Sequence, residues 1–205
     1  MKKGTKLDES TEEKIKEAAR IVFTQKGYAA AKVRDIAKEA DINLSLVNYY
    51  FRSKEKLFEL CMAENLQRLL AGNDPIINDE STTLIEKIER LVTLHLDMLL
   101  DNLDFPVFIV NEMLSGNTDL PGMDKRKDMI ANSVLAKQVM ALKKEGKLDM
   151  DPMHLVMNLA GMMLFPFLAR QRFIKNGAIN ETEFYQMIQE RKKLIPLWIG
   201  QMIGG

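Results

Sequence analysis

The sequence predicts an all-α protein, on the basis of three observations. Apolar residues recur at intervals of three and four along nearly every long segment, which is the pattern of a helix with one buried face. No segment shows sustained alternation of apolar and polar residues between turn signals, as a half-buried strand would. No internal repeat of roughly 20 to 50 residues is present, which argues against a solenoid. We therefore expect about nine helices in the 205 residues.

The first helix is expected over residues 10–26. Ser10 and Glu13 have the spacing of a capping box, in which each side chain satisfies the backbone N–H of the other residue. The apolar residues that follow share one helical face: Ile15, Ala18, Ala19, Val22 and Phe23. Gly27 is expected to end this helix, because glycine adopts positive φ without strain.

Two short amphipathic helices are predicted next, over residues 33–40 and 44–51. A fourth helix is expected to begin after Ser53, because serine is favoured as an N-cap, and to run to residue 71. The Gly-Asn-Asp-Pro cluster at residues 72–75 predicts its end.

Five further helices complete the expected fold. Their expected ranges are 81–103, 105–114, 123–145, 152–175 and 181–202. The Leu-Pro-Gly sequence at 120–122 and Gly146 mark breaks between them. Pro152 is expected in the first turn of its helix, where the missing N–H costs little.

Composition indicates a folded protein without disulfides. Hydrophobic residues make up 46% and charged residues 28% of the chain, which argues against disorder. Cys61 is the only cysteine, and we expect it to be a buried thiol. The basic N-terminus is not followed by an apolar segment, so we expect no secretory signal and a cytoplasmic location. The uncharged run at 152–169 contains His154 and Asn158, and we expect an interface helix there, not a membrane span.

Charge is distributed unevenly along the chain, although the formal net charge is zero. Residues 1–60 carry 13 Lys and Arg against 10 Asp and Glu, a net charge of +3. The remaining residues carry 16 against 19, a net charge of −3. The basic excess therefore coincides with the short helices near the N-terminus, as an electrostatic attraction to nucleic acid would require.

Residues 33–51 have the form of a helix-turn-helix, in which the second helix enters the major groove of DNA. Ile42, Val47 and Phe51 can face the core. That arrangement leaves four polar side chains to reach bases or phosphates: Asn43, Ser45, Asn48 and Tyr49. We therefore predict a DNA-binding domain over residues 1–53 and a second domain over residues 54–205.

At these residues the sequence resembles the TetR family of regulators. The resemblance is specific in three segments: the end of the first helix at Lys26-Gly27-Tyr28, the Val-Arg-Asp-Ile-Ala sequence at 33–37, and the Tyr-Phe-Arg-Ser-Lys-Glu-Lys-Leu sequence at 50–57. Helix order and lengths extend it over the whole chain. The resemblance implies that Asn43, Ser45, Asn48, Tyr49 and Tyr50 touch DNA. It also implies that Arg34 reaches a base and that Lys54 meets a phosphate.

Several of these residues have a second interpretation. Arg34 could instead pair with Asp35 or Glu39 on a solvated face, Asn43 could serve chiefly as an N-cap, and Tyr50 could be half core. Lys32 stands where the family commonly has a hydroxyl residue, and it could replace the phosphate contact electrostatically. Asp41 replaces a frequent turn glycine, and aspartate tolerates positive φ. Leu44 and Leu46 either touch thymine methyl groups or shield the helix.

The resemblance further implies a ligand site among the fourth to eighth helices and a dimer built on the last two. The candidate ligand residues are Met62, Leu66, His95, Met98, Phe105, Phe108, Asn111, Glu112, Phe165 and Arg170. The candidate dimerisation residues are Val156, Met157, Ala160, Met163, Phe167, Phe184, Met187, Ile188, Ile195 and Trp198. A stripe of Met and Phe is equally compatible with ordinary core packing, and His95 with a satisfied core histidine.

The sequence thus predicts a DNA-binding transcriptional regulator, a repressor that binds a palindromic operator as a homodimer. A small, largely apolar effector of unknown identity would release it, and no cofactor or metal is expected. The alternatives are a helical adaptor that binds only protein, and a TetR-fold activator without an inducer. An enzyme is disfavoured, because the chain has two distant histidines, one cysteine and neither a Walker loop nor a dinucleotide fingerprint.

Overall fold

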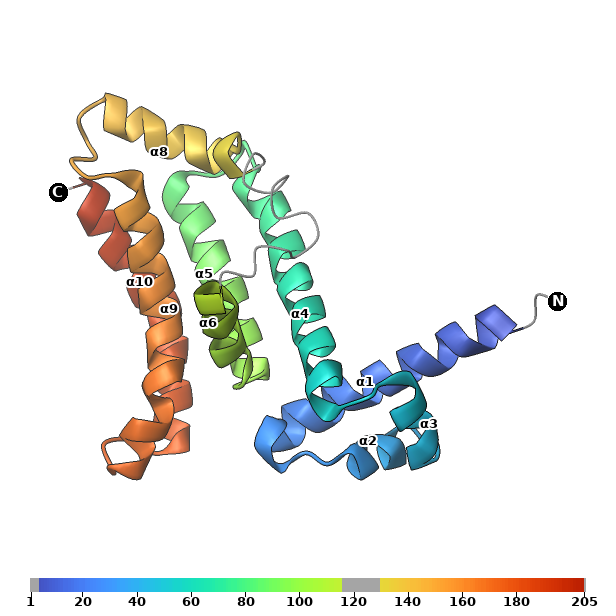
Figure 1. The fold of residues 1–205 in the computed structure, drawn as a ribbon. Coiled ribbons are helices and arrows are strands. Elements are labelled where there is room, and N and C mark those ends of the chain that lie inside the picture. The colour runs from blue at the N-terminus through green and yellow to red at the C-terminus, as the bar shows by residue number, and fades with distance from the viewer. Residues whose placement is uncertain (1–3, 116–129, 205) are drawn as a thin grey trace.

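The structure is a computed structural model that describes residues 4–115 and 130–204. Within those ranges the secondary structure is entirely helical. The helices are α1 (Gly4–Ala30), α2 (Val33–Glu39), α3 (Leu44–Tyr50), α4 (Lys54–Ile77), α5 (Leu84–Asp101), α6 (Phe105–Ser115), α8 (Val134–Lys144), α9 (Pro152–Lys175) and α10 (Glu181–Gly204). Figure 1 shows α1 to α3 as a small unit at one end of α4, with the remaining helices forming a body around the rest of α4. The all-α prediction is confirmed.

The first helix is longer than predicted. It begins at Gly4, so Ser10 lies inside it and is not its N-cap. No glycine or proline follows Gly4 before residue 10, and serine in a helix interior costs only about 0.5 kcal/mol, so the helix continues upstream. Gly27 interrupts the helical geometry with φ 71° and ψ 163°, as its position predicts.

The N-terminal unit is held by the predicted apolar faces. All five members of the α1 stripe are buried, from Ile15 to Phe23. Ile36 and Ala37 of α2 and Val47 of α3 complete this part of the core. Between the two short helices Asp41 adopts φ 49°, the positive value expected at this turn.

Helix α4 extends six residues beyond the predicted end, to Ile77. Ser53 caps its start as expected, accepting a hydrogen bond of 3.1 Å from the Lys56 N–H. Gly72 does not end the helix. A Cβ at this position would lie 3.0 Å from Cδ2 of Leu94, so the glycine permits close contact between α4 and α5. The extra turns therefore remain packed against α5 and carry residues 72–77 into the body.

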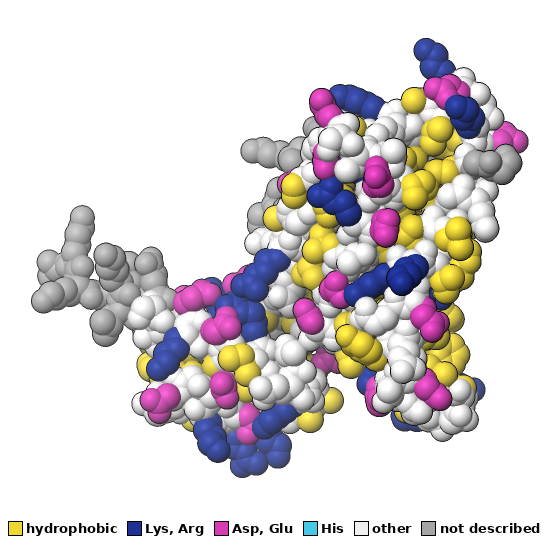
Figure 2. All heavy atoms as spheres, turned by 180° about the vertical axis from the view of Figure 1, so that it is seen from behind, with side chains coloured by type: hydrophobic (Ala, Val, Ile, Leu, Met, Phe, Trp, Pro, Cys, Tyr) yellow, Lys and Arg dark blue, Asp and Glu magenta, His cyan; other side chains and the backbone are white. Residues whose placement is uncertain are grey.

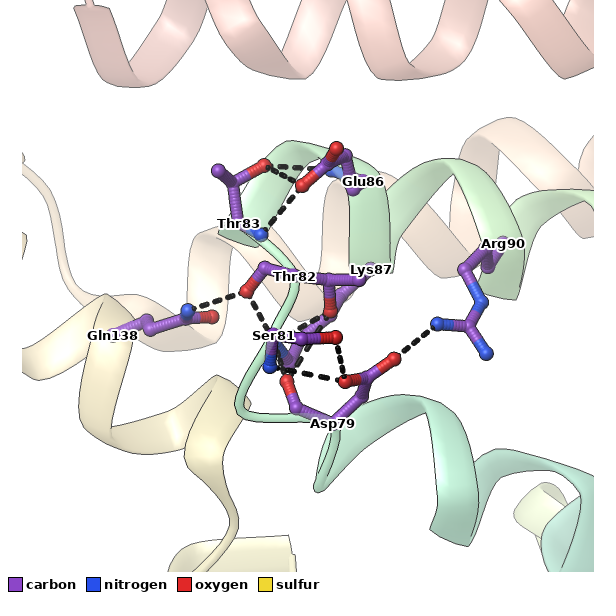
Figure 3. Close-up of polar contacts among 8 residues, drawn as sticks. All are labelled: Asp79, Ser81, Thr82, Thr83, Glu86, Lys87, Arg90 and Gln138. Atoms are coloured by element: carbon purple, nitrogen blue, oxygen red, sulfur yellow. Dashed lines mark hydrogen bonds and ion pairs between the residues drawn. The ribbon is translucent and has the colours of Figure 1, made fainter.

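The corner between α4 and α5 is organised around a buried lysine (Figure 3). Lys87 Nζ donates to the backbone oxygen of Asp79 at 2.5 Å and to the backbone oxygen and Oγ1 of Thr82 at 2.7 and 2.9 Å. Gln138 of α8 also donates to the Thr82 oxygen, at 2.9 Å. Because all three ammonium protons have acceptors, the burial of this charge is compensated, and the corner ties α8 to α5.

Helix α5 begins at Leu84 instead of residue 81, because Thr83 and Glu86 form a capping box there. The Thr83 N–H donates to Oε2 of Glu86 at 2.7 Å, and the Glu86 N–H donates to Oγ1 of Thr83 at 3.3 Å.

The single helix predicted over 123–145 is interrupted. Ile130 and Ala131 are helical, but the chain turns at residues 132–133 and α8 begins at Val134, capped by Ser133. The predicted break at 120–122 lies outside the described residues. Gly146 follows the end of α8 with φ 71°, which confirms it as the stop.

Helices α9 and α10 pack against each other and cover one side of α5 (Figure 1). Phe167 and Phe184 meet edge to face with ring centroids 5.5 Å apart. Arg191 donates to the backbone oxygen of Met162 through two guanidinium nitrogens, at 3.2 and 2.9 Å. By length and apolarity alone α9 could cross a membrane. One side of it lies in the body, where Leu155, Met163 and Phe167 are buried.

Candidate nucleic-acid interface and effector cavity

The start of α3 is fixed by Asn43. Its Oδ1 accepts the Leu46 N–H at 2.8 Å and the Ser45 hydroxyl at 2.7 Å. Asn43 is thus the N-cap of α3, and both side chains are exposed. The amide nitrogen of Asn43 and the oxygen lone pairs of Ser45 remain on the surface for an outside partner.

Two side chains of α3 project furthest from the core. Tyr49 is 75% exposed, and Asn48 is exposed with no hydrogen bond to a described residue. Tyr50 is half-buried against the core, and its ring meets the ring of Tyr49 edge to face at 5.3 Å. Tyr49 and Asn48 are therefore accessible to a partner, and the ring of Tyr50 lies between the core and Tyr49.

Arg34 of α2 lies on the same end of the molecule. It is exposed and makes no ion pair with any described residue. Its neighbour Asp35 instead pairs with Lys26 at 3.1 Å and accepts the Lys32 N–H at 3.2 Å. The hydrogen bond from Lys26 lowers the pKa of Asp35. The acid beside Arg34 is thus engaged elsewhere, and the guanidinium is open to an anionic or hydrogen-bonding ligand.

Lys54 has partners within the chain. Its Nζ donates to the backbone oxygens of Tyr28 and Ala31 at 2.8 and 3.2 Å, and lies 4.2 Å from the centroid of the Tyr28 ring. The ammonium therefore ties the start of α4 to the end of α1. One of its three protons is left for a phosphate.

Figure 2 shows Lys and Arg side chains gathered at the lower edge of the helix-turn-helix end. The exposed cations at the start of α2, within α2, in the α3–α4 connection and at the start of α4 are Lys32, Arg34, Lys38, Arg52 and Lys56. An exposed recognition helix beside a basic edge is the arrangement that a DNA-binding surface requires.

The body contains an apolar cavity of about 380 Å³ between α4, α5, α8 and α9, with one residue from α6. Its lining residues are Leu66, Leu69, Leu70, Asn73, Asp74, Ile77, Ile88, Leu91, Val92, His95, Leu99, Ile109, Ile130, Ser133, Leu135, Val156, Leu159, Ala160, Met163 and Leu164. A volume above roughly 300 Å³ with few polar groups is typical of a small-molecule site.

The polar part of the cavity wall comes from one turn of α4, one residue of α5 and Ser133 at the start of α8. His95 Nε2 lies 2.9 Å from Oδ1 of Asn73, and Asp74 follows on α4. Burial lowers the pKa of His95 to about 4, so its imidazole is neutral near pH 7. Ser133 uses its hydroxyl to donate to the Ile130 oxygen at 2.7 Å and to cap α8.

Residues 15–61 match the family described as bacterial regulatory proteins, tetR family. This segment of the chain, which includes the helix-turn-helix, is therefore similar to that family. The match covers α2, α3 and most of α1, together with the start of α4.

Further comparisons extend the likeness beyond the matched segment. A probable HTH-type transcriptional regulator of Bacillus subtilis, YttP, is 27% identical over 201 residues, which is 93% of this chain and 92% of the relative. A TetR/AcrR-family regulator of Thermobifida fusca superposes with a TM-score of 0.61 at 21% identity, covering 90% of this chain and 96% of the other. FadR of Bacillus subtilis, solved with stearoyl-CoA, superposes with a TM-score of 0.54 at 18% identity, covering 88% of this chain and 95% of the other. The two structures share the fold of this chain.

Among the described residues, the cavity lining contains two of the predicted ligand residues, Leu66 and His95. Met62 and Phe108 are packed in the core, and Met98 and Phe105 border a separate cleft beside α1. Phe165 is 62% exposed on the outside of α9. The side chains of Asn111 and Glu112 lie outside the described residues.

Arg170 is also not a cavity residue. It forms an ion pair with Glu181 and lies 5.6 Å from the ring centroid of Phe184, so its side chain packs against the start of α10.

The sequence interpretation missed Asn73, Asp74 and Ile77 because it ended α4 at residue 71. A helical continuation through Gly72 would have placed Asn73 and Ile77 on the face of α4 that carries Leu66 and Leu70, since these residues are three or four positions apart.

The predicted dimerisation residues divide into three groups by their exposure. Val156 and Met157 are 58% and 63% exposed. Five others are buried against helices of their own chain and cannot present their side chains to a partner: Met163, Phe167, Phe184, Ile188 and Ile195. Ala160, Met187 and Trp198 are partly exposed. Sequence periodicity identified the apolar residues of α9 and α10 but could not say which side faces α5.

The surface of α9 and α10 nevertheless carries an apolar face. Its exposed members are Met153, Val156, Met157, Phe165, Leu168, Tyr185, Leu197 and Met202. Figure 2 shows hydrophobic side chains exposed along this side of the body. We call this surface the α9–α10 face.

A hydrogen bond connects the body to the helix-turn-helix unit. Asp104, which directly precedes α6, accepts the Tyr28 N–H at 2.5 Å beside the interruption at Gly27. The Asp104 N–H is in turn held by Oδ1 of buried Asn102 at 3.1 Å. Helix α6 contributes Ile109 to the cavity, so residues 104–109 contact both the apolar cavity and the N-terminal unit.

Proposed function

We propose that this protein is a TetR-family transcriptional repressor that binds a roughly palindromic operator as a homodimer and is released by a small-molecule effector. The observation that carries the DNA-binding part is the exposed set of Arg34, Asn48 and Tyr49, which lies beside a basic edge and has no ion pair with described residues. In this proposal Arg34 and Asn48 read base edges, while Lys32 and Lys54 contact phosphates. Asn43, Ser45, Tyr49 and Tyr50 complete the contact surface.

The α9–α10 face supports the dimer. An apolar surface of this kind is unfavourable in water, and the same face of a second copy would cover it about a two-fold axis. Two recognition helices can then enter successive major grooves about 34 to 36 Å apart. A dimer seated on an operator blocks polymerase without needing a further contact surface.

The cavity supports the effector part. FadR of Bacillus subtilis, which shares this fold, was solved with stearoyl-CoA. In this chain the cavity would take a largely apolar molecule with one or two polar groups. The ligand would favour a dimer in which the recognition helices are wrongly spaced for the operator, so affinity for DNA would fall. As a regulator of transcription the protein would act in the cytoplasm, where DNA is accessible.

Selection of the full-length protein against a random duplex library tests this proposal, followed by titration of the enriched site at two salt concentrations. We expect a palindromic site and a steep loss of affinity with salt. Weak binding to all sequences would contradict operator recognition and support the helical adaptor.

Arg34→Ala is expected to relax the preference at one base pair in each half-site, costing about 1 to 3 kcal/mol of discrimination. Lys193→Ala provides the control, because it removes an exposed cation from α10. Equal losses on every sequence for Arg34→Ala would exclude base reading by Arg34.

A further inference from the structure

The described wall of the cavity carries negative charge and no positive charge. Its described lining contains one carboxylate, that of Asp74, and no lysine or arginine. Asp74 is only partly exposed, and its carboxylate makes no ion pair with a described residue. The remaining wall is mainly aliphatic. A ligand in this cavity therefore meets an unpaired negative charge at one place and hydrocarbon almost everywhere else.

The tautomer of His95 follows from its hydrogen bond. Asn73 Oδ1 can only accept, so Nε2 of His95, at 2.9 Å, must carry the proton. A neutral imidazole has one N–H, which leaves Nδ1 with a lone pair and no partner among the described residues. An acceptor of this kind in the cavity wall can receive a hydrogen bond from a ligand.

The two groups require the same chemistry. Asn73 and Asp74 are consecutive in α4, Asn73 holds His95, and all three residues line the same cavity. A protonated amine supplies both a positive charge and N–H donors. A carboxylate or phosphate head would find no cation among the described lining residues and would be repelled by Asp74.

We propose that the effector of this protein is a lipophilic amine, bound as a cation by Asp74 and His95 with its hydrocarbon in the aliphatic part of the cavity. This inference rests on the proposed function, because it names the ligand class of the same cavity. It separates this chain from FadR of Bacillus subtilis, which shares the fold and was solved with an acyl-CoA.

Three matched compounds test the proposal: adamantylmethylamine, adamantylmethanol and adamantanecarboxylate. They share one compact hydrocarbon and differ in a cationic, neutral or anionic head. Titration calorimetry on the full-length protein is expected to show the amine binding about tenfold or more tightly than the alcohol, and the carboxylate most weakly. Tightest binding by the carboxylate, equal affinity of amine and alcohol, or no binding by any of the three would overturn the proposal.

Two variants localise the effect. Asp74→Asn should reduce affinity for the amine about tenfold and leave the alcohol within about twofold. His95→Phe removes the hydrogen-bond acceptor and should weaken the binding of both the amine and the alcohol. Asp149→Asn, which neutralises an exposed carboxylate outside the cavity, serves as the matched control and should change neither. An Asp74→Asn protein that binds the amine as tightly as the unchanged chain would contradict a role for this carboxylate.

Operator binding measured in the same samples separates this inference from the proposed function. Amine binding with the expected variant pattern but without release of DNA would support the ligand class and contradict induction. Release of DNA by the carboxylate and not by the amine would support induction and overturn the ligand class.

Discussion

At the scale of single residues, Lys54 and His95 each connect two helices by hydrogen bonds. Lys54 crosses from α4 to the end of α1, and His95 crosses from α5 to Asn73 of α4. Both are polar groups whose partners lie on another helix. Their loss therefore affects the relative placement of helices as well as any ligand contact.

Lys54→Met is expected to destabilise the protein by about 1 to 2 kcal/mol, because it keeps the aliphatic stem but removes two hydrogen bonds to backbone oxygens. Urea unfolding followed by circular dichroism measures the change. Lys56→Met is the control, since Lys56 is exposed and pairs only with Glu59 on the surface. Equal stability of the two variants would contradict a stabilising contact of Lys54 between α4 and the end of α1.

The neutral state of His95 predicts a pH dependence of stability. Its pKa in the folded protein is about 4, below the ordinary value of 6.5, so the unfolded chain binds the additional proton between these values. This contribution is complete above pH 6.5 and is lost as the pH falls toward 4, by up to about 3 kcal/mol.

Urea unfolding at several pH values tests this dependence, with His95→Phe as the comparison. The variant should lose less stability between pH 6.5 and 4. The lowered pKa values of Asp35, Asp79 and Glu86 act at more acidic pH, because these groups are already ionised in the unfolded chain above about pH 4.5. An unchanged slope in the variant would mean that His95 is not the group responsible.

At the scale of elements, the sequence predicted some local caps and stops, although Ser10 does not begin α1 and the caps at Thr83 and Ser133 were not identified. Ser53, Asn43 and Gly146 act through neighbouring backbone groups and were located correctly. The end of α4 was not predictable in this way, because Gly72 is placed by its contact with Leu94 of α5, which is distant in sequence. The same missing turns hid Asn73 and Asp74, and with them the polar part of the cavity.

Gly72→Val is expected to destabilise the protein by about 1 to 3 kcal/mol, because even a Cβ would lie 3.0 Å from Leu94 Cδ2. Thermal unfolding measures the loss. Ala71→Val places the same side chain at the adjacent exposed position and should cost about 0.5 kcal/mol. Similar losses in both variants would show that valine acts through helix propensity and not through the α4–α5 contact.

At the scale of the whole molecule, the sequence predicted which helices are apolar but not how each is turned. Residues such as Phe184 and Ile195 satisfy the same periodicity as Met157, yet they are buried within the chain. The direction of a helical face depends on contacts between distant segments, which a single sequence does not reveal.

Met157→Glu is expected to shift the protein toward monomers, because it places a charge on the α9–α10 face. Sedimentation at several protein concentrations measures this shift, and affinity for a full palindrome should fall more than affinity for a half-site. Leu103→Glu changes a residue that is 40% exposed between α5 and α6 and is the control. A Met157→Glu protein that remains dimeric would place the interface on another surface.

Helix α4 begins in the helix-turn-helix unit and ends at the cavity. Its 24 residues form a rod about 36 Å long. Tilting such a lever by about 5° at the cavity end moves its other end by about 3 Å, close to the rise of one base pair along DNA. A small tilt of α4 at the cavity can therefore displace its other end, beside α3, by about one base-pair step.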